Sequence, residues 1–147
     1  MKVTTMNNLL AALVLATLPF QMSWANAQEP KSAKITLVYE QKIPGMPNKS
    51  LKGILVEYGP GAVNPAHTHA KSALIYASVL EGSVLNQLNG GPVRTFTKGQ
   101  NFTEMPGDRH DVSANASKTE PAKVLAVFVV DTDDTKLTTP IAPGTGK

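Results

Sequence analysis

Three histidines are the residues whose types and spacing could hold a metal ion, and the 147-residue chain contains no others. His67 and His69 are two residues apart. On a strand, such positions point to the same face, so both imidazoles could reach one ion at about 2.0–2.1 Å. His110 follows a glycine-containing turn about forty residues later, where a returning strand could bring it opposite the pair. Without further support His-x-His is a weak motif, because such histidines can equally be packed or surface residues.

Glu104 is the candidate catalytic residue. In a strand predicted over residues 101–105, Phe102 and Glu104 share one face. A carboxylate on an inward face is costly to bury unless it is paired, hydrogen-bonded or bound to a metal. Glu104 could therefore be a metal ligand, a partner that holds a histidine, or a general base with a raised pKa. If the strand lies at a sheet edge, Glu104 would simply be solvated.

Three further side chains are predicted to bind substrate, namely Asn86, Tyr76 and Phe102. The period of two along its strand turns Asn86 toward the same cavity as the histidines, and Gln87 is the alternative if a bulge intervenes. Tyr76 could supply a phenol to the site, although a tyrosine in a strand more often serves packing.

Short β-type segments separated by glycine- or proline-containing turns make up most of the chain, and no segment has a persuasive helical period. Strands are predicted over Ile35–Glu40, Leu51–Tyr58, Val63–His69, Leu74–Leu80, Ser83–Leu88, Val93–Thr97, Asn101–Met105, Asp111–Ala114 and Lys123–Val130. This spacing favours an all-β sandwich or barrel. The apolar segment 124–130 is predicted to be a central strand buried on both faces. The polar tail from Asp131 onward is predicted to lie over the surface or to fray.

Cysteine is absent, which excludes disulfides, thiolate ligands and a cysteine nucleophile. The formal net charge is +3. Because lysines and arginines are scattered and aromatic residues are few, nucleic acid is not an expected partner.

The first 27 residues have the layout of a secretory signal peptide. Lys2 precedes an apolar segment, Leu9–Phe20, and the small-residue site Ala25-Asn26-Ala27 follows. The apolar segment is shorter than the roughly 20 residues that span a bilayer, which disfavours an uncleaved anchor. Cleavage after Ala27 would give a secreted or periplasmic protein with no membrane association.

Two segments resemble the two sequence motifs of the cupin superfamily. Gly61–His69, followed by a strand into Val79–Gly82, resembles the first motif, and Gly99–His110, followed by Asn115, resembles the second. The spacing from Gly99 to His110 matches the family pattern, although Met105 stands where a proline is common. The resemblance covers about residues 50 to 131.

The resemblance implies a fold and an arrangement of domains. The expected fold is a single-domain, cupin-type double-sheet β-barrel of the jelly-roll kind, with a metal held by His67, His69 and His110 between the sheets. Residues 28–48 would form an arm and the first strand, 49–131 the barrel, and 132–147 the tail. A homodimer paired through an edge strand is one expected partner arrangement.

One departure from the family pattern concerns the fourth metal ligand. The resemblance implies a glutamate shortly after the second histidine, but the candidate positions are Ala73, Leu74 and, counting back from Gly82, Ile75. Three interpretations stay open: a three-histidine site completed by water, a substitute ligand from elsewhere such as Glu104, or a weak or lost metal site.

The functional expectation follows from the histidines and the resemblance. Histidine ligands suit iron, zinc, nickel or copper, whereas manganese prefers carboxylates, so iron, zinc or nickel is favoured over manganese. Together they suggest a metal-dependent oxygenase, isomerase or lyase acting on a small molecule. The alternative is a non-catalytic module that binds a small ligand or a metal.

Overall fold

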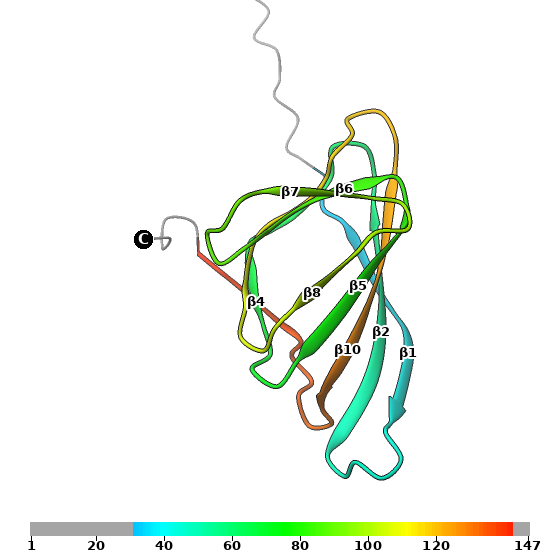
Figure 1. Cartoon of the computed structure of the whole chain (residues 1–147), viewed down its shortest axis with the longest axis vertical. Coiled ribbons are helices and arrows are strands. Elements are labelled where there is room, and N and C mark those ends of the chain that lie inside the picture. Colours follow the sequence, from blue (N-terminus) through cyan, green and yellow to red (C-terminus); the bar gives the residue numbers. More distant parts are fainter. Residues whose placement is uncertain (1–30, 143–147) are drawn as a thin grey trace, which may run out of the picture.

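The computed structural model describes residues 31–142, which form two antiparallel sheets (Figure 1). The strands are β1 (Lys34–Lys42), β2 (Lys49–Tyr58), β3 (Val63–Asn64), β4 (His67–His69), β5 (Leu74–Glu81), β6 (Ser83–Leu88), β7 (Arg94–Thr97), β8 (Asn101–Glu104), β9 (Arg109–Asn115), β10 (Ala122–Asp131) and β11 (Thr138–Pro140). Within this range no helix is long and apolar enough to span a membrane. The predicted signal peptide, residues 1–27, lies outside the described residues.

The two sheets confirm the expected double-sheet, all-β architecture. One sheet has the strand order β1-β2-β10-β5-β8, and the other has the order β11-β4-β9-β6-β7, with β3 also pairing with β9. Strands β8 and β7 are therefore edge strands, one in each sheet. β10 pairs with β2 on one side and β5 on the other, as predicted for a central strand. Its outward residues are only half-buried, so the prediction of burial on both faces is wrong.

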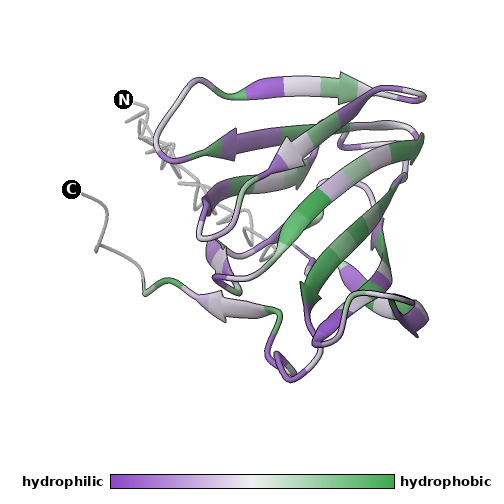
Figure 2. Ribbon diagram, turned by 60° about the horizontal axis from the view of Figure 1, so that its bottom comes forward, coloured by the Kyte–Doolittle hydropathy of each residue, from purple (hydrophilic) through white to green (hydrophobic). Residues whose placement is uncertain are grey.

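Inward-facing side chains of both sheets form the core, as the alternation along β5 illustrates: Ile75, Ala77 and Val79 are buried, while Leu74 and Tyr76 are exposed. Hydrophobic and hydrophilic residues occur together on most strands (Figure 2). One buried cluster consists of Tyr58, Ala62, Ala77, Val79, Val84, Ala122 and Val124, and a second of Ile54, Ala73, Ile75, Phe128 and Val130. These two clusters pack the sheets against each other and so fix the distance between the sheets near the histidines.

The strand predicted over residues 63–69 is divided into β3 and β4 in the structure. Pro65, which has no N–H to donate to a ladder, lies in the break. Both short strands still pair with β9. His67 and His69 remain on one face, since both are buried while Thr68 between them is half-buried.

The polar tail contains a strand, which corrects the expectation that it only lies over the surface or frays. β11 pairs with β4, and backbone hydrogen bonds from Ala70 N to Leu137 O and from Ile141 N to Ala66 O extend the contact. Without β11, the outer edge of β4 would have unpaired N–H and C=O groups. The sheet therefore reaches well beyond residue 131, where the barrel was predicted to end.

Candidate metal centre

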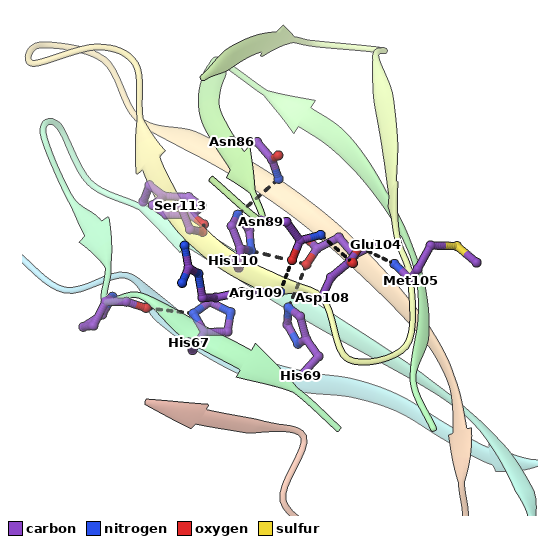
Figure 3. A network of polar contacts seen from close by, with 12 residues as sticks. His67, His69, Asn86, Asn89, Glu104, Met105, Asp108, Arg109, His110 and Ser113 are labelled. Carbon is purple, nitrogen blue, oxygen red and sulfur yellow. Dashed lines mark hydrogen bonds and ion pairs between the residues drawn. The ribbon is translucent and has the colours of Figure 1, made fainter. Parts of the chain in front are cut away.

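The three histidines come together on two neighbouring strands of the same sheet. His67 and His69 lie on β4 and His110 lies on β9, directly opposite His67 in the ladder. All three are buried, and one ligand nitrogen from each lies within 4.8 Å of the others. Their rings converge in the space between the sheets (Figure 3). The predicted clustering is confirmed, and its geometry is consistent with a metal site.

Glu104 reaches the same point from the opposite sheet. Its Oε2 atom lies 2.8 Å from His69 Nε2 and 3.4 Å from His110 Nδ1. Its strand, β8, is an edge strand, yet Glu104 is only 3% exposed because its side chain points between the sheets. The alternative of a solvated carboxylate is therefore wrong.

Several buried polar atoms of this cluster have no hydrogen-bond partner among the described residues. They include both ring nitrogens of His69 and Oε2 of Glu104. His69 Nε2 and Glu104 Oε2 lie 2.8 Å apart, but their relative orientation does not make a hydrogen bond. Buried polar atoms without partners are costly, and a cation placed among them would satisfy them. The donor set of three imidazoles and one carboxylate therefore fits a bound divalent metal.

The electrostatics favour an ionised Glu104. Burial raises the pKa of Glu104, but contacts with His110 and His69 outweigh burial and lower that pKa to about 2. Of the alternatives open for Glu104, the general base with a raised pKa is therefore disfavoured, because an ionised carboxylate with so low a pKa is a weak base at neutral pH. Burial also lowers the pKa of His67, which favours the neutral imidazole that binds metals.

Neighbouring groups fix the orientation of two of the histidines. His67 Nδ1 lies 2.7 Å from the carbonyl oxygen of Pro65, to which it can donate, leaving Nε2 free to face the cluster. Asn86 Nδ2 lies 3.1 Å from His110 Nε2. Such contacts hold a ligating imidazole in one orientation and commonly matter for metal affinity.

The turn between β8 and β9 is fastened by Asn89, a residue that sequence reasoning missed. Asn89 Nδ2 donates to Asp108 Oδ1 at 2.7 Å, and Arg109 N donates to Asn89 Oδ1 at 2.9 Å. Asp108 also accepts from the backbone N–H of Met105 at 2.7 Å. The position of Asn89 before Gly90 signals a turn, but nothing in that signal reveals a partner about twenty residues away.

A small, mainly apolar cavity of about 70 Å³ adjoins the histidines. Asn86 and Phe102 line it, as predicted. Tyr58 and Ser113 line it too, and their hydroxyl oxygens lie 2.7 Å apart. These two residues were not predicted, because nothing in the local pattern separates them from ordinary strand residues.

Tyr76 does not belong to this cavity. It is 49% exposed on the outer face of β5, because its neighbours Ile75 and Ala77 point into the core. The prediction that its phenol faces the site is wrong. The period of two along this strand allows only one of the two sets of residues to face inward.

Glu104 lies beside one of the positions considered for the missing glutamate ligand. Ile75, one of the three positions considered for that ligand, is buried and pairs with Glu104 across the β5–β8 ladder. The carboxylate thus comes from the adjacent strand of the same sheet.

Comparison with known proteins gives relatives over part of this chain. The rhicadhesin receptor of Pisum sativum is 33% identical over 92 residues, covering 60% of this chain and 41% of that protein. Germin-like protein 1-1 of Oryza sativa subsp. japonica is 27% identical over 106 residues, covering 70% of this chain and 48% of that protein. The chain therefore spans less than half the length of these curated relatives.

Solved structures share the fold at low sequence identity. A conserved protein with a double-stranded β-helix domain from Klebsiella pneumoniae has a TM-score of 0.57 at 19% identity, covering 69% of this chain and 79% of that chain. Oxalate oxidase in complex with the substrate analogue glycolate has a TM-score of 0.54 at 23% identity, covering 71% of this chain and 54% of that chain. The family model of the cupin domain matches residues 54–128, which is half of the chain. This protein belongs to the cupin domain family.

Proposed function

We propose that His67, His69 and His110 hold one divalent metal ion, with Glu104 as a fourth protein ligand. The observation that carries the proposal is the convergence of three buried imidazoles and a buried carboxylate, among which His69 and Glu104 have buried polar atoms without hydrogen-bond partners. A bound ion would supply Lewis acidity or, for a redox-active metal, electron transfer to a small molecule.

The choice among metals depends on Glu104. Three histidine ligands favour iron, zinc or nickel over manganese, which prefers carboxylates. Glu104 Oε2 lies 2.8 Å from His69 Nε2 and adds an oxygen donor to the set. Manganese therefore stands beside iron, zinc and nickel as a candidate.

The reaction type that suits the site is a metal-dependent oxygenase, isomerase or lyase reaction on a small molecule. Support comes from the cavity of about 70 Å³, whose apolar wall would exclude most water. Within it, Asn86 holds His110, and the hydroxyls of Tyr58 and Ser113 could bind polar atoms of a substrate. The alternative, a non-catalytic binding module, is favoured by the lowered pKa of Glu104, which makes it a weak proton acceptor.

The compartment proposed for this activity is the periplasm or the exterior of the cell. The support is the layout of residues 1–27, with Lys2, the apolar segment 9–20 and the site Ala25-Asn26-Ala27.

Metal analysis of the exported protein tests the proposal. Intact mass should place the first residue at Gln28, and elemental analysis should give near one metal ion per chain. Turnover of carbonyl, thiol or phenolic substrates that stops with a chelator and returns with the metal would identify an enzyme. Ligand binding that survives chelation and His67→Ala would identify the binding module. A metal-free protein that iron, zinc, nickel and manganese all fail to load would contradict the metal site.

A second copy of the chain is the proposed partner along β1. This edge strand exposes Ile35, Leu37, Val38 and Tyr39, and exposed apolar edges favour pairing. Sedimentation should give twice the mass of one chain, and Leu37→Lys should shift the protein toward a single chain. Val93→Lys is the control, since Val93 is exposed to the same 52% but lies away from β1. A wild-type monomer, or equal behaviour of both variants, would contradict this arrangement.

A further inference from the structure

A groove larger than the metal-centre cavity lies between the edges of the two sheets. Its volume is about 370 Å³, within the usual range for small-molecule sites. It is lined by Asn86, Leu88, Gly91, Pro92, Arg94, Phe96, Asn101, Phe102 and Thr103. These residues come from β6, β7 and the turn between them on one sheet and from β8 on the other. The rings of Phe96 and Phe102 meet across the sheets with centroids 4.8 Å apart.

The groove adjoins the metal centre. Asn86 and Phe102 line both the groove and the smaller cavity. Asn86 contacts His110, and Phe102 lies on the same face of β8 as Glu104. Asn86 and Phe102 therefore stand between the groove and the metal-centre cavity. A molecule in the groove would have one end against these two side chains.

Arg94 is the titratable residue among those that line the groove. It is the cross-strand partner of Asn86, so both side chains project from the same face of the sheet. The guanidinium carbon lies 5.5 Å from the centre of the Phe96 ring, a cation–π distance that restrains the side chain. Within residues 31–142 no acidic group lies within ion-pair distance of Arg94.

The other polar groups of the groove are neutral. Asn86 and Asn101 offer amides, and Thr103 offers a hydroxyl. A single guanidinium with neutral hydrogen-bonding neighbours suits a planar carboxylate, which it can bind through two parallel hydrogen bonds. Phosphate sites usually add several backbone N–H groups or a helix N-terminus, and the lining residues here lie on strands and a turn.

We propose that the groove between β7 and β8 binds small carboxylate ligands, with Arg94 as the counter-ion and the rest of the ligand directed toward Asn86 and the histidines. This assignment deepens the proposed function and rests on it for the metal. It gives the proposed enzyme or binding module a ligand class, namely small organic acids.

Titrations of the metal-loaded protein with defined acids test the assignment. The probes are acetate, malonate, succinate and benzoate, with succinamide as a neutral analogue and inorganic phosphate as a competing anion. At least one carboxylate should bind, and Arg94→Gln should weaken it about tenfold, as expected for a charged hydrogen-bonded pair. Arg94→Lys keeps the charge without the planar guanidinium, so its affinity for the carboxylate should lie between those of the wild type and Arg94→Gln. Lys98→Gln removes an exposed charge at the β7–β8 turn, outside the groove, and should leave binding unchanged.

Metal content measured on the same proteins separates the two proposals. Arg94→Gln should carry as much metal as the wild type, because Arg94 does not contact the histidines. Carboxylate binding that depends on Arg94 in a protein that takes up no metal would retain the groove and reject the proposed function. Three results would overturn the groove assignment in a metal-loaded protein: no carboxylate binds, Arg94→Gln binds as the wild type does, or succinamide or phosphate binds at least as tightly.

Discussion

Replacing His67 and His69 together by alanine is expected to reduce the metal content from near one ion per chain to near zero. The two imidazoles lie on the same face of β4, and His110 and Glu104 alone would remain to hold the ion. Loss of an outer hydrogen-bond partner of a ligand commonly weakens metal binding 10–100-fold, so loss of two direct ligands should exceed about 100-fold. Elemental analysis and calorimetric titration of the metal into the purified protein measure the effect.

Two companion variants sharpen that experiment. Glu104→Gln keeps the shape of the side chain but removes its charge. It should weaken metal binding less than the replacement of both histidines does. Tyr76→Ala alters an exposed side chain on the outer face of β5 and should leave binding unchanged. Circular dichroism checks that each variant keeps its sheets. A folded His67→Ala/His69→Ala protein with wild-type metal content would rule out the proposed ligands.

Gly82→Ala is expected to lower the free energy of unfolding by about 3 kcal/mol or more. Gly82 has a φ of +66°, and an added Cβ would lie 2.3 Å from the carbonyl oxygen of Pro121 and 3.0 Å from the Cα of Ala122. These are backbone atoms at the start of β10, and Ala122 is fully buried. The clash can be relieved only by moving the central strand away from the turn between β5 and β6. Urea unfolding of the variant and the wild type measures the loss.

Gly99→Ala is the matched control for this prediction. Gly99 has a φ of +86°, but an added Cβ would meet nothing within 4 Å. The loss in free energy of unfolding should therefore come only from placing alanine in a left-handed backbone conformation, which costs about 1–2 kcal/mol. The difference between the two variants isolates the steric contact with Pro121. Equal losses at both positions would show that this contact has no role in stability.

The sequence was sufficient for features that depend on local periodicity. Alternation along β8 and the turns at Gly82 and Gly99 define strand ends and inward residues that can be counted, such as Phe102 and Glu104. The i, i+2 spacing of His67 and His69 predicted their shared face for the same reason. Their approach to His110 depends on the pairing of β4 with β9, which joins residues about forty positions apart, and the structure places the three together.

Features that depend on distant partners could not be predicted. The pKa of Glu104 is lowered by two histidines that reach it across the space between the sheets, so the pattern of its own strand could not decide among the alternatives for this carboxylate. Tyr76 was predicted to face the site but lies on the outer face of β5. The sequence alone does not say which of the two alternating sets of β5 residues faces inward. The strand at residues 138–140 was missed because a polar segment gains strand structure here from pairing with β4.

The strand that carries His67 and His69 is only three residues long, and both of its sheet partners come later in the chain. β9 supplies His110 on one side, while Thr138 and Pro140 of β11 pair with His69 and His67 on the other. During synthesis the histidine strand therefore lacks one of its two sheet partners until residues 138–140 have been added. The three histidines can therefore gain their complete sheet setting only after β11 has been made, and a chain that stopped before Thr138 would leave the outer edge of β4 unpaired.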